Sequence, residues 1–158
     1  MPNKPDSAEM ESMAKEIFDL AKLVYALRSQ RAADQNELTE TEFLTLDALV
    51  REQPLTIGEL QHRVGVVPAQ MSRIVRALET ARGKGFLECT INAEDRRRVD
   101  VSITPSGMEA YEQYRALRLA STRAILAGLT LDDRRHFMRI LRLIRTHMSK
   151  LAAKPGGA

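Results

Sequence analysis

The hydrophobic pattern of the chain changes from a helical to a strand-like period near residue 85 and changes back near residue 104. Before this segment, apolar residues recur every three or four positions, as on one face of an α-helix. Within it, Val99, Val101 and Ile103 alternate with polar residues, and a second apolar run covers residues 86–91. Two such runs around the polar stretch 92–98 predict a β-hairpin with a long tip. One hairpin among helices indicates a mainly α fold of the α+β class.

Capping patterns predict where the helices around the hairpin begin. Thr39 is followed three residues later by Glu42, and the same spacing recurs at Thr56, which is the sequence pattern of a capping box. Pro68 suits the first turn of a helix, where its missing N–H costs nothing, and Gly65 suits the end of the short helix before it. We therefore expect helices beginning near Asp6, Thr39, Thr56, Val67, Thr104 and Thr130.

The first expected helix carries an apolar stripe that nothing nearby in the sequence can cover. Its members recur at alternating steps of three and four: Met10, Met13, Ile17, Leu20, Val24 and Leu27. This spacing is typical of a coiled-coil seam. Because the polar stretch 28–37 follows, the stripe packs either on a later helix or on a second chain.

Residues 56–82 have the pattern of a helix-turn-helix: a short helix, a tight turn over residues 64–68 and a longer helix. On the longer helix, we expect Val67, Met71, Ile74, Val75 and Leu78 to face the core. Gln can bond the edge of adenine and Arg that of guanine, whereas small apolar side chains suit the thymine methyl group. The candidate DNA-contacting residues are Pro68, Ala69, Gln70, Ser72, Arg73 and Arg76. The alternative for this face is a solvated helix surface.

Three consecutive arginines, Arg96, Arg97 and Arg98, lie at the expected tip of the hairpin. An exposed guanidinium there is suited to a narrow minor groove, and we expect Asp95 to hold Arg97 in one rotamer. Between residues 70 and 98, seven cations outnumber four carboxylates, which matches the whole-chain net charge of +3. A helix-turn-helix followed by a basic hairpin predicts a reader of double-stranded DNA that uses both grooves.

The hairpin resembles the wing of the MarR-type (multiple antibiotic resistance) regulators. In that family an Asp-Arg-Arg tip leads into a strand that ends in Leu-Thr-x-x-Gly. Here Asp95-Arg96-Arg97 leads into a strand ending in Ile103-Thr104-Pro105-Ser106-Gly107, with Ile103 in place of the usual Leu. The link over residues 81–85 looks a residue or two longer than the family's short turn, so the wing is expected at a different angle.

The resemblance implies a winged helix-turn-helix protein that acts as a homodimer on pseudo-palindromic operator DNA, with half-sites about one helical turn apart. It divides the chain into an N-terminal dimerisation helix (1–37), the DNA-binding domain (38–107) and C-terminal dimerisation helices (108–158). The expected function is a transcriptional regulator, and by family habit a repressor. Members of the family often bind small aromatic or phenolic effectors, for which the candidate residues here are Tyr25, Arg63 and Tyr111.

The remaining residues favour no enzyme, cofactor or metal site. The three histidines, at positions 62, 136 and 147, adjoin no other cluster of ligand-type residues, and no nucleophile or phosphate-loop motif is present. Cys89, the single cysteine, is expected to be a passive strand residue rather than a redox sensor. We expect no membrane segment and a cytoplasmic location. A winged-helix protein-interaction module that does not read DNA remains the alternative function.

Overall fold

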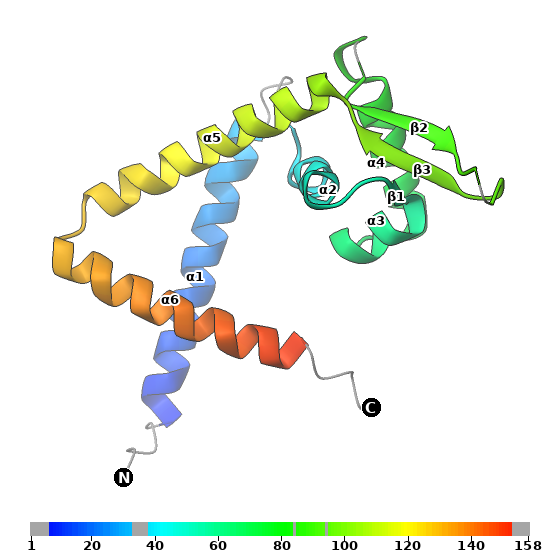
Figure 1. Cartoon of the computed structure of the whole chain (residues 1–158). Helices are drawn as coiled ribbons and strands as arrows, with labels where there is room; N and C mark the ends of the chain where they lie inside the picture. Colours follow the sequence, from blue (N-terminus) through cyan, green and yellow to red (C-terminus); the bar gives the residue numbers. More distant parts are fainter. Residues whose placement is uncertain (1–6, 33–37, 84, 94, 153–158) are drawn as a thin grey trace. The chain divides into compact units, whose positions relative to one another are not determined.

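The computed structural model describes residues 7–32, 38–83, 85–93 and 95–152 (Figure 1). The chain divides into two compact units, Met1–Tyr114 and Arg115–Ala158, with the boundary inside one long helix. The expected mainly α fold with one small sheet is confirmed, whereas the division at residues 37 and 107 stays a prediction. In chain order, the elements are α1 (Ser7–Ala32), α2 (Glu40–Arg51), β1 (Leu55–Thr56), α3 (Ile57–Val64), α4 (Pro68–Glu79), the 3₁₀ turn η1 (Ala81–Gly83), β2 (Leu87–Ile91), β3 (Val99–Ile103), α5 (Pro105–Ala127) and α6 (Leu131–Ala152).

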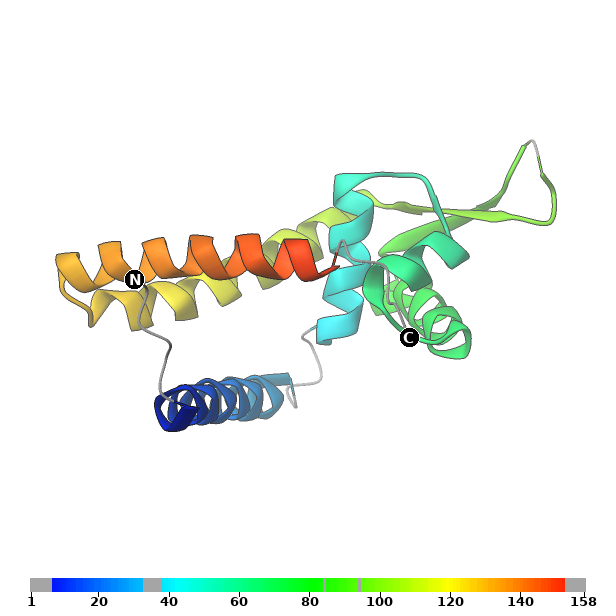
Figure 2. The same cartoon turned by 90° about the horizontal axis from the view of Figure 1, so that it is seen from below.

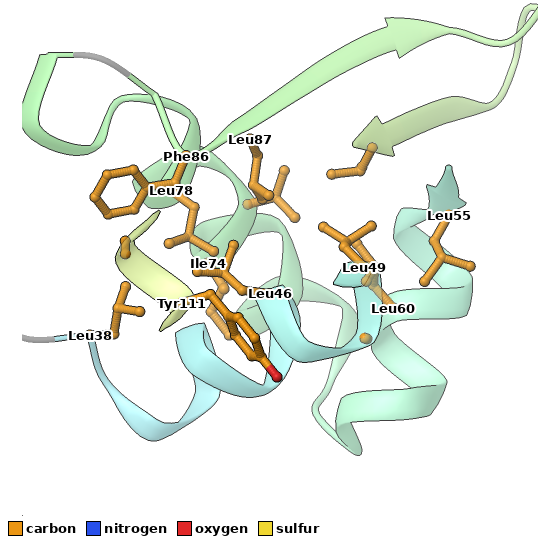
Figure 3. Close-up of a cluster of buried hydrophobic side chains, with 14 of the residues drawn as sticks. Leu38, Leu46, Leu49, Leu55, Leu60, Ile74, Leu78, Phe86, Leu87 and Tyr111 are labelled. Atoms are coloured by element: carbon orange, nitrogen blue, oxygen red, sulfur yellow. The ribbon is translucent and has the colours of Figure 1, made fainter. Parts of the chain in front are cut away.

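The core of the first unit is aliphatic and is contributed by α2, α3, α4, the sheet and the first turns of α5 (Figure 3). Leu46, Leu60, Met71 and Val101, which come from four different elements, are completely buried. Each of these helices places its apolar positions at intervals of three or four, so one face is available for the core. Burial of this shared face holds the three short helices and the sheet together as one lobe.

Thr side chains begin the helices at the predicted places. The Thr39 hydroxyl accepts a bond from the backbone N–H of Glu42, whose carboxylate accepts one from the Thr39 backbone N–H in return. Thr56 and Glu59 repeat this arrangement at α3, which ends at Gly65 with a positive φ of 74°. These reciprocal bonds satisfy orphan donors of the first turn. The expected cap at Asp6 lies outside the described residues, and α1 continues to Ala32, past the last residue of the apolar stripe at Leu27.

The sheet has a third strand that the periodicity did not predict. β1 contains only Leu55 and Thr56, and it pairs antiparallel with β3, giving the strand order β1-β3-β2. The Gln53 side chain extends this edge, because its carbonyl oxygen accepts a bond of 3.0 Å from the backbone N–H of Ile103. Two residues are too few to show an alternating pattern, so only pairing with β3 reveals this strand. β1 ties the hairpin to the start of α3.

Two tyrosines anchor the first turns of α5 to α2. The Phe43 ring stacks on Tyr111 at 5.2 Å and on Tyr114 at 4.6 Å between ring centroids. The Tyr111 hydroxyl donates to the Asp47 carboxylate at 2.9 Å, and the Tyr114 hydroxyl donates to the Glu40 carboxylate at 3.2 Å. Aromatic stacking with satisfied hydroxyls fixes this end of α5 to the lobe.

The predicted Thr-x-x-Gly motif forms a tight junction between β2 and α5. The Thr104 N–H donates to the Phe86 carbonyl at 3.0 Å, and the Thr104 hydroxyl donates to the Gly85 carbonyl at 2.8 Å. The same hydroxyl accepts a bond from the Gly107 N–H at 3.0 Å. A Cβ at Gly107 would lie 2.1 Å from the Phe86 carbonyl oxygen, so no other residue fits this position.

In the second unit, the part of α5 after Tyr114 and α6 are consecutive helices joined by a short turn (Figure 2). The Thr130 hydroxyl accepts a bond from the backbone N–H of Asp133 and caps α6 as predicted. Every described side chain of α6 from Leu131 to Lys150 is exposed in the single chain. None of the described helices is long and apolar enough to cross a membrane.

We expect Gly107→Ala to lower the free energy of unfolding by about 3 kcal/mol or more, because the new methyl group must displace the backbone of β2. The matched control is Gly58→Ala in α3, where a Cβ meets nothing within 4 Å. That substitution should leave stability unchanged or raise it by up to ~1 kcal/mol. Urea denaturation of both variants measures the difference, and equal midpoints would contradict the close approach at residue 107.

Candidate nucleic-acid interface

The second helix of the helix-turn-helix, α4, is divided into a buried and an exposed face. Met71, Ile74, Val75 and Leu78 are buried, as predicted. The exposed face carries the expected polar and small residues: Pro68, Ala69, Gln70, Arg73 and Arg76, with Ser72 half-buried at its edge. α4 contacts α3 on one side and β2 on the other, so its exposed face has a fixed orientation within the lobe. These candidate residues therefore share one rigid surface.

Val67 does not face the core as predicted. It is the N-cap residue of α4, and its side chain is 63 % exposed. Its backbone is extended, with φ −76° and ψ 155°, so the helical spacing that places Met71 in the core does not yet apply to it. Together with Pro68 and Ala69, it forms an exposed apolar tip at the start of α4. The sequence pattern could not reveal this because it counted Val67 as a helical position.

The wing is the hairpin of β2 and β3, paired from Leu87↔Ile103 to Ile91↔Val99. The described residues of its tip, 92–93 and 95–98, stand clear of the helices of the lobe (Figures 1 and 2). Arg96, Arg97 and Arg98 are all exposed there, as expected. Because β2 packs on α4, the hairpin and the exposed face of α4 belong to the same lobe. Three guanidinium groups are thus presented on an ordered arm beside the helix-turn-helix.

Asp95 orders the wing tip, but not through the Arg97 guanidinium. Its carboxylate accepts a 3.0 Å bond from the Arg97 backbone N–H and lies 3.8 Å from the Arg98 guanidinium. Its own N–H donates to the Asn92 side-chain carbonyl at 2.8 Å, and its carbonyl accepts from the Arg98 N–H at 2.9 Å. Asp95 therefore holds the backbone of Arg97 rather than the rotamer of its side chain. The Asn92 amide extends this network to Asp100 at 2.8 Å.

The link between α4 and the wing contains two glycines, Gly83 and Gly85, which the sequence pattern suggested as the end of the helix. α4 ends at Glu79, before the two glycines, and η1 follows. Gly85 has a φ of +64°, and a Cβ there would lie 2.7 Å from the Glu79 carbonyl oxygen. This turn lets the Phe86 N–H donate to the Leu78 carbonyl at 2.7 Å. The glycine therefore brings β2 back against the end of α4.

Charged groups near the base of the wing influence one another. The pKa of Glu59 is lowered from its ordinary value of 4.5, first by the bonds from the Thr56 hydroxyl and backbone, and to a smaller extent by the nearby Arg63 and Arg98 cations. Arg63 also donates to Glu52 at 2.6 Å. The Glu59 carboxylate at the start of α3 is thus close enough to Arg98 of the wing for the two charges to attract each other.

The three candidate effector residues occupy different environments. Tyr25 on α1 is 74 % exposed, whereas Tyr111 is buried in the aromatic stack with α2. Arg63 is exposed on α3 and is paired with Glu52. Tyr111 thus has a structural role in the lobe, since its ring and its hydroxyl both contact α2. The structure does not group these three side chains as one cleft, and their role in binding an effector stays a prediction.

Cys89 is half-buried on β2, packed against the core of the lobe. Burial raises the pKa of its thiol, and the Glu79 carboxylate raises it further by its charge and by a hydrogen bond. A raised pKa leaves little thiolate at neutral pH, and the thiolate is the reactive form. Among the described residues, no group of three or more His, Cys, Asp or Glu side chains is placed to hold a metal ion.

We expect Cys89 to react slowly with iodoacetamide at pH 7 and faster as the pH rises, because its thiolate is disfavoured. Glu79→Gln should increase the rate at pH 7 by removing the negative charge beside the thiol. Labelling rates followed by mass spectrometry, with free glutathione as the reference thiol, measure both effects. A wild-type rate at pH 7 above that of glutathione would contradict the passive role.

The comparisons with known proteins agree with this geometry. Residues 38–99 match the family model described as MarR family. The match covers α2 through the wing tip, so the predicted resemblance is confirmed for that region. It ends at the first residue of β3, and the helices α1, α5 and α6 lie outside it.

Similar proteins extend over most of the length of this chain. The chain is 27 % identical over 149 residues to an uncharacterised helix-turn-helix transcriptional regulator, YwaE of Bacillus subtilis, covering 94 % of this chain and 85 % of the relative. The fold is similar to that of a mutant of Staphylococcus aureus MepR (TM-score 0.71, 17 % identity, 85 % and 97 % coverage). It is also similar to Bordetella bronchiseptica BpsR (TM-score 0.62, 20 % identity, 84 % and 98 % coverage), whose structure is described as a mechanism for regulation of DNA binding by 6-hydroxynicotinic acid.

Proposed function

We propose that this chain is a sequence-specific DNA-binding regulator of transcription that acts as a homodimer. The observation that carries the proposal is the rigid lobe in which the exposed polar face of α4 and the arginine tip of the wing are held together. A helix of this kind enters the major groove, and an arginine at a wing tip enters the adjacent minor groove. The MarR family match over the same residues supports this function.

In this proposal, different residues of α4 contact different chemical groups in the major groove. Arg73 and Arg76 bond guanine edges or phosphates, and Gln70 bonds adenine. The apolar tip formed by Val67, Pro68 and Ala69 suits contact with thymine methyl groups. The wing arginines, with their backbone ordered by Asp95, contact the minor groove and its phosphates.

The proposed dimer covers apolar surfaces that the single chain leaves exposed. On α1, Met10, Met13, Ile17 and Leu20 are each more than half exposed. On α6, Phe137, Ile140, Ile144 and Met148 are exposed as well. Long stripes of this kind are rare on monomers and mark protein interfaces. We propose that a second copy covers them, which places two winged-helix lobes on the two halves of a pseudo-palindromic operator.

Control by a small aromatic or phenolic effector is a further part of the proposal. It is supported by the regulation of DNA binding stated for BpsR, whose fold this chain shares. An effector that binds one conformation of the dimer better than the other would change the fraction of dimers able to bind both half-sites. We propose repression rather than activation because members of the MarR family commonly act as repressors.

Selection of bound duplexes from a random DNA pool, with a competitor nucleic acid present, tests the proposed function. We expect a two-fold symmetric motif, because two identical lobes related by a two-fold axis read the same sequence on opposite strands. Sedimentation equilibrium of the same preparation should give a dimer. A folded dimer that enriches no motif would instead favour the protein-interaction module.

Arg97→Ala should weaken binding to the selected operator by about 1–3 kcal/mol if this side chain enters the minor groove. Arg97→Lys keeps the charge but loses the planar guanidinium, so an effect close to that of Ala would indicate groove insertion rather than phosphate contact. Arg51→Ala on α2 is the control, because that arginine is exposed but pairs with Asp47 away from the proposed interface. Fluorescence anisotropy measures all three, and wild-type affinity for Arg97→Ala would remove Arg97 from the interface.

A further inference from the structure

The largest concentration of positive charge lies neither on α4 nor on the wing. Residues 115–158 contain ten lysines and arginines and only two carboxylates, a net charge of +8, whereas the whole chain carries +3. Residues 1–114 therefore carry −5, even though they include the wing. The excess found between residues 70 and 98 is smaller than that of the second unit. This unit is the most suitable part of the chain for a polyanion.

Four of these ten cations are arranged along one face of α6. At about 100° per residue, Arg135, Arg139, Arg142 and Arg145 fall within an arc of roughly 120°. We call these four residues the arginine ridge. The ridge lies roughly opposite the apolar stripe of Phe137, Ile140 and Ile144. A partner that covers the apolar stripe therefore leaves the ridge exposed.

Within the described part of the chain, none of the four ridge arginines forms an ion pair with a carboxylate. The two carboxylates of α6, Asp132 and Asp133, both lie in the first turn of that helix. Like charges three or four residues apart, such as Arg135 and Arg139, destabilise a helix. α1 is different, since it has four cations and four carboxylates. The ridge arginines therefore repel one another, and a bound anion would relieve this repulsion.

We propose that the arginine ridge is a second, sequence-independent DNA-binding surface that contacts the phosphate backbone of a duplex. The ridge extends about 15 Å along α6, a length over which a duplex presents about nine negative charges. Arginine is the residue best suited to phosphate, and all four members are arginine. Binding to a lipid surface would need the apolar stripe of α6 inserted into the bilayer, which would compete with the proposed dimer. Phosphate contacts need only the ridge.

The test compares four full-length proteins on a duplex of random sequence: the wild type, the ridge variant R135Q/R139Q/R142Q, the wing variant R96Q/R97Q/R98Q, and the control K15Q/R51Q/R123Q. The ridge variant and the control lose the same charge, and Gln preserves helix propensity. Anisotropy titrations at several salt concentrations give the affinity and its salt slope. Sedimentation equilibrium confirms that each protein is a dimer, and circular dichroism confirms its helix content.

We expect the ridge variant to lose at least tenfold in affinity for random duplex at low salt, with a salt slope smaller by about 2.7. The wing variant should retain binding that the ridge mutations then remove when the two sets are combined. The control should stay within twofold of the wild type. The ridge proposal and the proposed function can fail independently. Operator selection by the wild type tests the proposed function, whereas the random-duplex titrations test the ridge.

Three results would overturn the proposal. Equal affinities and slopes for the ridge variant and the control would make the ridge a solvated face. Loss of the dimer in the ridge variant would show that the arginines pair with carboxylates of a second copy. Binding of the wild type to phosphatidylglycerol vesicles that the ridge variant loses, with DNA affinity unchanged, would assign the ridge to a lipid surface.

Discussion

The winged-helix lobe depends on the close contact between the backbone of β2 and the first turn of α5. The Phe86 carbonyl accepts the Thr104 N–H, and it lies so near Gly107 that no side chain fits between them. On one side of this contact, Gly85 and Phe86 hold β2 against the end of α4. On the other, Tyr111 and Tyr114 carry α5 onto α2. The relative orientation of α4, the wing and α5 therefore follows from one junction.

This junction explains why an exposed arginine tip can act as part of a rigid surface. A hairpin of two strands is only marginally stable alone. Here β1 pairs with one edge of β3, α4 packs on β2, and Asp95 with Asn92 fixes the backbone of the tip. Less conformational entropy is then lost when the arginines bind. The distribution of charge adds a second feature, because the unit outside the winged-helix lobe carries a net charge of +8, whereas the unit that contains the lobe carries −5.

Much of this lobe was predictable because its signals are local. Capping boxes at Thr39 and Thr56, the glycine that ends α3 and the Thr-x-x-Gly motif all act within a few residues, and all appear in the structure. The buried face of α4 and the exposed wing arginines follow from the periods of helix and strand. The candidate DNA-contacting side chains were likewise identified from the sequence, and the structure places them on exposed surfaces of one lobe, whereas the role of each in binding remains proposed.

The sequence by itself determined where the helices and the two strands of the wing lie, because helix capping and the hydrophobic period are properties of neighbouring residues. Only the tertiary structure decided features that depend on contacts distant in the chain. It pairs Leu55 with Val101 as a third strand, exposes Val67 at a helix cap, and places Tyr111 in a stack with Phe43. It also directs Asp95 to the backbone of the wing rather than to the Arg97 side chain. Each of these outcomes depends on which backbone or side chain lies nearby after folding, and that information is absent from a local pattern.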